Sequence, residues 1–61
     1  MNNIVAMTCG YMDAMKQLKG GTYVSPVATL SETKYNITLE DEPYYLNGCI
    51  EAVNKFKLQT K

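Results

Sequence analysis

The chain has 61 residues, the length of one small domain, and its six lysines balance six acidic residues to give zero formal net charge. Because it contains no histidine, the usual catalytic triads and most catalytic zinc sites are excluded. Zero net charge also argues against a strongly electrostatic binder of polyanions.

The small size limits how stable the chain can be alone. Natural domains of this size often add disulfides, a metal or a partner subunit. Two cysteines are too few for a disulfide framework, and no CxxC pair offers metal ligands. No apolar run reaches the roughly 18 residues of a membrane-spanning helix, and the first residues lack the pattern of a secretory signal. We therefore expect a cytoplasmic protein with no membrane partner, which gains support from another molecule.

Residues 3 to 19 carry the spacing of an amphipathic helix. Its predicted core stripe, with apolar residues at i, i+3, i+4 and i+7, contains Ile4, Met7, Tyr11, Ala14, Met15 and Leu18. The opposite face is predicted to hold Ala6, Asp13 and Gln17. Asn2 or Asn3 can cap the start of this helix, and Gly20 can end it. A strand over residues 4 to 9 is the alternative, less favoured because the helical pattern is longer.

The segment from residue 22 to residue 40 predicts a β-hairpin. Tyr35, Ile37 and Leu39 alternate with polar residues, as in a strand with one buried face. The preceding run is rich in Thr, Val and Tyr, which favour strands. Pro26 cannot donate to a sheet, so it places this first strand at an edge or in a bulge.

Residues 44 to 60 predict either a short third strand followed by a second helix, which is favoured, or a helix throughout. One face of that helix is predicted to hold Leu46, Cys49, Ile50, Val53 and Phe56. Asn47 is favoured as its cap, although Pro43 also suits a helix start. The expected fold is therefore α+β, a single domain over residues 1–61 with two helices packed on one face of a small antiparallel sheet, in the order α-β-β-(β)-α.

The two cysteines offer little chemistry. We expect Cys49 to be a buried apolar residue with an inert thiol, and Cys9 to be partly exposed. A nucleophilic cysteine needs a base or a positive field, which only Lys16 or a helix N-terminus could supply here. No phosphate-binding or dinucleotide motif is present. We expect reduced thiols, no cofactor, no metal and no enzymatic activity.

Exposed apolar and aromatic residues are the best evidence for a partner. Val5 and Met12 form a second apolar strip on the first helix, which a small domain cannot easily bury together with the first. Tyr23 lies on the predicted edge strand. Tyr44 and Tyr45 are consecutive, so one of them is expected to face outward. Tyrosine and methionine are both enriched at protein interfaces, so these five residues are candidate interface positions.

Three consecutive carboxylates, Glu40, Asp41 and Glu42, complete the candidate interface. Short runs of like charge are usually solvated turns, and their simplest functional role would be contact with a basic protein surface.

These features favour a small non-enzymatic protein-binding module, a regulator or inhibitor that occupies a surface of a larger macromolecule, of the kind found among phage and mobile-element proteins. One alternative is a nucleic-acid accessory protein using Lys34, Lys55 and Lys57 with Tyr44 or Tyr45. Another is a structural homodimer that buries the spare apolar strip between two copies.

Overall fold

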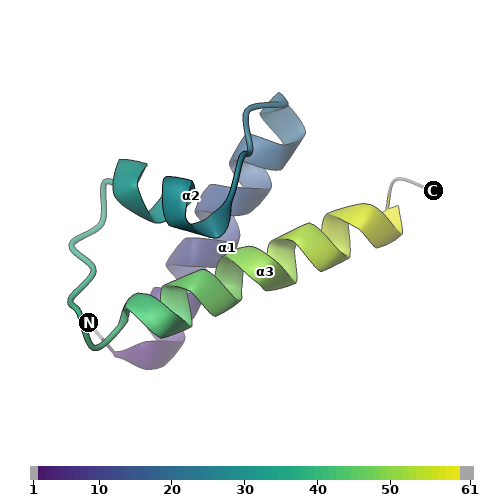
Figure 1. Ribbon diagram of the computed structural model, residues 1–61. Helices are drawn as coiled ribbons and strands as arrows, with labels where there is room; N and C mark the ends of the chain where they lie inside the picture. Colours follow the sequence, from purple (N-terminus) through teal and green to yellow (C-terminus); the bar gives the residue numbers. More distant parts are fainter. Residues whose placement is uncertain (1, 60–61) are drawn as a thin grey trace.

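The chain folds into three helices, shown in Figure 1 from a computed structural model that describes residues 2–59. Helix α1 spans Asn3–Gly20, α2 spans Pro26–Glu32 and α3 spans Glu42–Gln59. Helices α1 and α3 cross each other, and the short α2 lies over the first half of α3. The described residues contain no strand, so the expected α+β fold with an antiparallel sheet is wrong.

Helix α1 begins and ends at recognisable caps. The side-chain oxygen of Asn2 accepts a hydrogen bond from the Val5 backbone N–H at 2.8 Å, which satisfies one orphan donor of the first turn. At the other end, Gly21 adopts a left-handed conformation with φ of 75°. Its N–H donates to the carbonyl of Leu18. The predicted helix over residues 3 to 19 is confirmed, and the alternative strand is wrong.

Helix α2 replaces the first strand of the predicted hairpin. The Ser25 hydroxyl accepts a hydrogen bond from the Ala28 N–H at 3.1 Å, and Pro26 occupies the first turn, where its missing N–H costs nothing. The predicted second strand is an irregular linker. Its alternating residues share no buried face, because Leu39 is 81% exposed whereas Ile37 packs against the core. The capping signal at residue 25 outweighs the β-propensity of its neighbours.

Helix α3 begins earlier than predicted. The Asp41 carbonyl accepts the Tyr45 N–H at 3.0 Å, so the first turn already contains residues 42 to 45. A start at Asn47 after a third strand is therefore wrong, and the alternative start near Pro43 matches the structure. Proline at this position is pre-organised for a helix.

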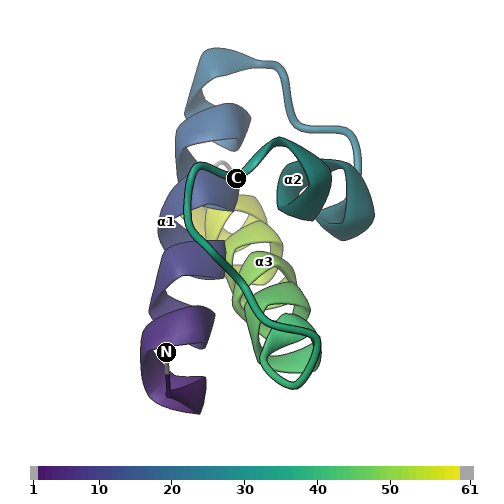
Figure 2. The same cartoon turned by 90° about the vertical axis from the view of Figure 1, so that its left-hand side faces the viewer.

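The core lies where α1 crosses α3 (Figure 2). All buried apolar side chains of the described residues come from these two helices: Ala6, Cys9, Ala14, Tyr45, Cys49 and Ala52. The predicted core stripe is therefore partly wrong. Ile4 is 73% exposed, whereas Ala6, expected on the polar face, is fully buried.

Two glycines explain why small residues form this core. A Cβ atom added at Gly10 would overlap the carbonyl group of Tyr45, and one added at Gly48 would overlap the carbonyl group of Met7. The two backbones therefore touch, so most side chains beside the contact are small, and Tyr45 is the one large apolar side chain that is fully buried among the described residues. Large apolar side chains of α1 are displaced to the flanks and the outer surface.

Candidate functional site

The outer surface of α1 is the most unusual feature of the molecule. We define the α1 outer face by five exposed residues on one side of its first three turns: Ile4, Val5, Met7, Thr8 and Met12. The apolar members of this set are between 37% and 73% exposed. None of the residues from Asn3 to Met12 is charged, although the solvent-facing side of a helix normally carries charged and polar residues.

The one polar member of the α1 outer face has its hydroxyl satisfied within the helix. Thr8 Oγ1 donates to the Ile4 carbonyl at 2.9 Å. Covering this threonine would therefore leave no unpaired hydroxyl donor, which lowers the cost of removing the face from water.

A groove between α1 and α3 continues this face. Its volume is about 620 Å³. It is lined by Met7, Thr8, Tyr11, Asn47, Gly48, Ile50 and Glu51. Met7 and Thr8 belong to both the groove and the α1 outer face, so the two form one continuous surface. Glu51 supplies the one charge in the groove lining.

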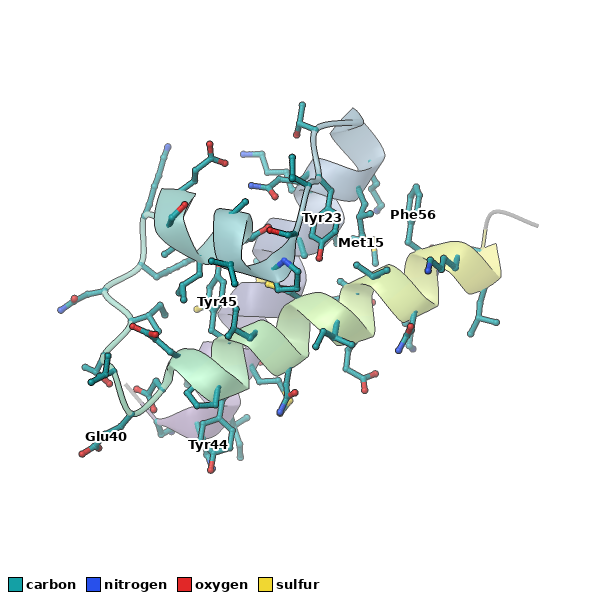
Figure 3. The ribbon with its side chains drawn as sticks, in the orientation of Figure 1. Met15, Tyr23, Glu40, Tyr44, Tyr45 and Phe56 are labelled. Carbon is teal, nitrogen blue, oxygen red and sulfur yellow. The ribbon has the colours of Figure 1, made fainter. Side chains whose placement is uncertain are left out.

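The five apolar and aromatic candidates separate into exposed and inward-facing residues. Val5 and Met12 are 43% and 55% exposed. Tyr44 is 38% exposed and points away from the molecule in Figure 3, whereas Tyr45 is fully buried and points toward the other helices. Tyr23 is half-buried and packs against the core cluster. Tyr45 therefore cannot contact a partner in this conformation, and its role is structural.

Tyr45 is the centre of a polar network that the sequence pattern does not reveal. Its hydroxyl donates to Asp13 Oδ2 at 2.5 Å, and Thr33 Oγ1 donates to the same oxygen at 2.7 Å. Burial, and then the hydrogen bond to this carboxylate, raise the pKa of Tyr45 well above its ordinary value. Asp13 was predicted to face solvent, and nothing in the helical periodicity marks it as a partner of a residue 32 positions away.

Both cysteines are free and buried, so the expectation of a partly exposed Cys9 is wrong. Cys49 Sγ donates to the Gly10 carbonyl at 3.4 Å. Burial raises the pKa of the Cys49 thiol to about 11, and the negative charge of Asp13 adds to the effect. Burial, followed by the same carboxylate, also raises the pKa of Cys9. A nucleophilic thiol needs the opposite shift.

The acidic run does not form one outward-facing patch. Asp41 is only 7% exposed and accepts a hydrogen bond from Thr38 Oγ1 at 3.1 Å, so it stabilises the turn before α3. Glu42 is half-buried, and Glu40 alone extends fully from the linker (Figure 3). The expectation of a wholly solvated acidic turn is wrong at its middle residue. Within the described part of the chain, no group of three His, Cys, Asp or Glu residues could hold a metal ion.

The lysines suggested for phosphate contact do not converge. Lys55 and Lys57 lie two residues apart on α3, about 200° apart around the helix axis, and Lys34 lies in the linker after α2.

None of the helices within residues 2–59 combines the length and the apolar character needed to cross a membrane. Comparison with protein-family models, curated proteins and solved structures found no match to this chain.

Proposed function

We propose that the chain is a small non-enzymatic protein-binding module, a regulator that uses the α1 outer face and the adjoining groove to occupy a surface of a larger protein. One observation carries this proposal. From Asn3 to Met12, α1 has no charged residue on any side, yet α3 covers only its inner side.

The chemistry of the surface favours a protein ligand. Met7 and Met12 are flexible apolar side chains that can adapt to an irregular partner surface. The groove offers a recess for an apolar side chain, and Glu51 in its lining can accept a hydrogen bond from a basic or amide group. A partner helix that presents apolar residues next to a lysine or arginine would match this arrangement.

The proposal is tested by affinity purification from an extract of the native host. Immobilised native chain is compared with Met12→Lys, which places a charge in the α1 outer face. Leu58→Lys is the matched control, because Leu58 is 70% exposed near the end of α3, outside this face. The native chain and the control should capture the same protein, and Met12→Lys should reduce capture at least tenfold, roughly the effect of losing one buried hot-spot residue. Equal capture by both variants, or no specific capture by the native chain, contradicts the proposal.

A structural homodimer is the second candidate. A two-fold contact uses the same surface of both copies, so a charged residue near the two-fold axis meets its own copy and is repelled. The α1 outer face contains no charge and avoids this repulsion. Sedimentation equilibrium over micromolar to millimolar concentrations should then show the mass rising from 6.8 kDa toward twice that value. A constant mass of 6.8 kDa rules out this second candidate.

A further inference from the structure

We infer that residues 22–40, which comprise α2 and its two linkers and which we call the α2 cover, detach from the crossed α1–α3 pair as a unit while that pair remains folded. The chain would thus have a closed state, seen in the structure, and an open state in which the core face of α3 is uncovered.

Burial is divided unequally between the pair and the cover. The six buried apolar residues all lie on α1 or α3, and the one buried residue of the α2 cover is polar, Thr29. The cover contributes three half-buried apolar side chains, Tyr23, Leu30 and Ile37, which pack against the core cluster. Regions with few buried apolar contacts open at lower free energy than the rest of a fold.

Hydrogen bonds also link the cover to the pair, among them a backbone bond from the Thr22 N–H to the Gln17 carbonyl at 2.9 Å. Thr29 Oγ1 donates to Gln17 Oε1 at 2.7 Å, and Thr33 Oγ1 donates to Asp13 at 2.7 Å. The Tyr45 hydroxyl also lies 3.4 Å from the Thr29 carbonyl. Water can replace such bonds when the cover opens, so the neutral bond to Gln17 contributes little net stability, whereas the bond to the Asp13 carboxylate contributes more.

The α1–α3 pair is stabilised by contacts between its own two helices. The backbone contacts at Gly10 and Gly48 join α1 to α3 directly and do not involve the cover. Helix α2 has seven residues, too few to stay helical once released. The open state should therefore combine a folded α1–α3 pair with an unfolded segment from residue 22 to residue 40.

Native-state hydrogen exchange at increasing urea concentrations tests the inference. Amides of α2 should exchange through an opening whose free energy depends only weakly on urea concentration, because this opening exposes little surface. Amides near Ala14 and Cys49 should exchange only through an opening with the full urea dependence of global unfolding. If α2 shares the protection and the urea dependence of α1 and α3, the cover does not open separately and the inference is wrong.

Alkylation of Cys49 distinguishes detachment from melting in place. This thiol is fully buried in the cluster against which Tyr23 packs, and trypsin separates it from Cys9 because Lys16, Lys34 and Lys55 flank the two sites. Reaction with N-ethylmaleimide, followed by mass spectrometry of the two peptides, should show Cys49 reacting through the weakly urea-dependent opening. If Cys49 reacts only on global unfolding, the cover melts without leaving, which overturns the inference.

A matched pair of variants tests whether the Thr29 hydroxyl holds the cover on the α1–α3 pair. Thr29→Val removes the hydroxyl that bonds Gln17, and should speed α2 exchange and Cys49 alkylation about fivefold to tenfold. Thr8→Val makes the same chemical change on the α1 outer face, where the hydroxyl bonds its own helix, and should leave both rates unchanged. Equal effects of the two variants would contradict the role of the Thr29 hydroxyl in holding the cover on the α1–α3 pair.

Discussion

Gly10 of α1 and Gly48 of α3 are each pressed against the backbone of the opposite helix, 38 positions apart in sequence but at the same crossing point. Neither position has room for a Cβ atom, because the atoms that it would meet belong to the backbone rather than to a flexible side chain. Cys49, next to Gly48, adds a further link between the two helices, because its thiol donates a hydrogen bond to the Gly10 carbonyl.

Replacement of Gly48 by alanine should therefore destabilise the protein. The added methyl group would meet the Met7 carbonyl, so the helices must separate, and we expect a loss of about 3 kcal/mol in the free energy of unfolding, the upper end of the range for overpacking. Urea denaturation followed by circular dichroism measures this loss. Gly20→Ala is the control, because nothing lies within 4 Å of the added atom and alanine favours a helix. A Gly48→Ala protein as stable as the control would contradict the close backbone contact.

Asp13 and Tyr45 should show strong energetic coupling. The phenol donates to a carboxylate, and hydrogen bonds to charged groups contribute about 1.5–3 kcal/mol. We expect Asp13→Ala and Tyr45→Phe each to destabilise the protein, and the double variant to lose less than the sum of the two by at least about 1 kcal/mol. Urea denaturation of all four proteins measures the cycle. Additive losses would mean that the two side chains do not interact.

Stability should fall at alkaline pH through Cys49. Its folded-state pKa is raised to about 11 from 9.0, so the unfolded chain loses this proton first and is favoured as pH rises. The thiol of Cys49 makes its full contribution to the free energy of unfolding below pH 9. This contribution falls by about 2 kcal/mol between pH 9 and pH 11. The raised pKa of Tyr45 adds a further loss that begins at about pH 10.

Urea denaturation at intervals from pH 8 to pH 11 measures this dependence. Cys49→Ala removes the thiol, so the loss between pH 9 and pH 10 should become shallower while the tyrosine-dependent loss persists. If the native chain and this variant show identical pH profiles, the raised pKa of the thiol is not a determinant of stability.

A comparison of Ala6→Lys with Met12→Lys tests which side of α1 is buried. Ala6 is completely buried, so a lysine there introduces an unpaired charge and should unfold the chain. Met12 is more than half exposed, so its replacement should change the free energy of unfolding by less than about 0.5 kcal/mol. Thermal denaturation of the two variants distinguishes them. Equal destabilisation would contradict the assigned orientation of α1.

The extent of α1 could be predicted from local signals, but its buried side could not. Asn2 and the glycines after Leu18 mark the two ends, and the long helical spacing identifies the element. Periodicity assigns the core to the largest apolar residues, such as Ile4. A close crossing instead selects small ones, such as Ala6, because the other backbone occupies the space that a large side chain would fill. That choice depends on α3 and is not encoded within α1.

The hairpin prediction failed for a different reason. Strand propensity over residues 22 to 40 reflects single residues, whereas a strand also needs a partner to satisfy its backbone. The pair Ser25 and Pro26 is a local helix-start signal that was available in the sequence. The exposure of Val5 and Met12 was more accessible to prediction, because it required only the helical assignment of α1. Tyr45 could not be placed, because its partner Asp13 lies on another helix.

The crossing of α1 and α3 also bears on the order of folding events. The two helices that enclose the buried apolar residues are joined by the whole of residues 21 to 41, so this connection must close before the core can form. Closure entropy grows only with the logarithm of length, and doubling the connection costs about 0.6 kcal/mol. Natural insertions in the exposed stretch from Lys34 to Asn36 should consequently be tolerated. A one-residue insertion in α3 before Gly48 would shift the register of that glycine and abolish the helix pairing.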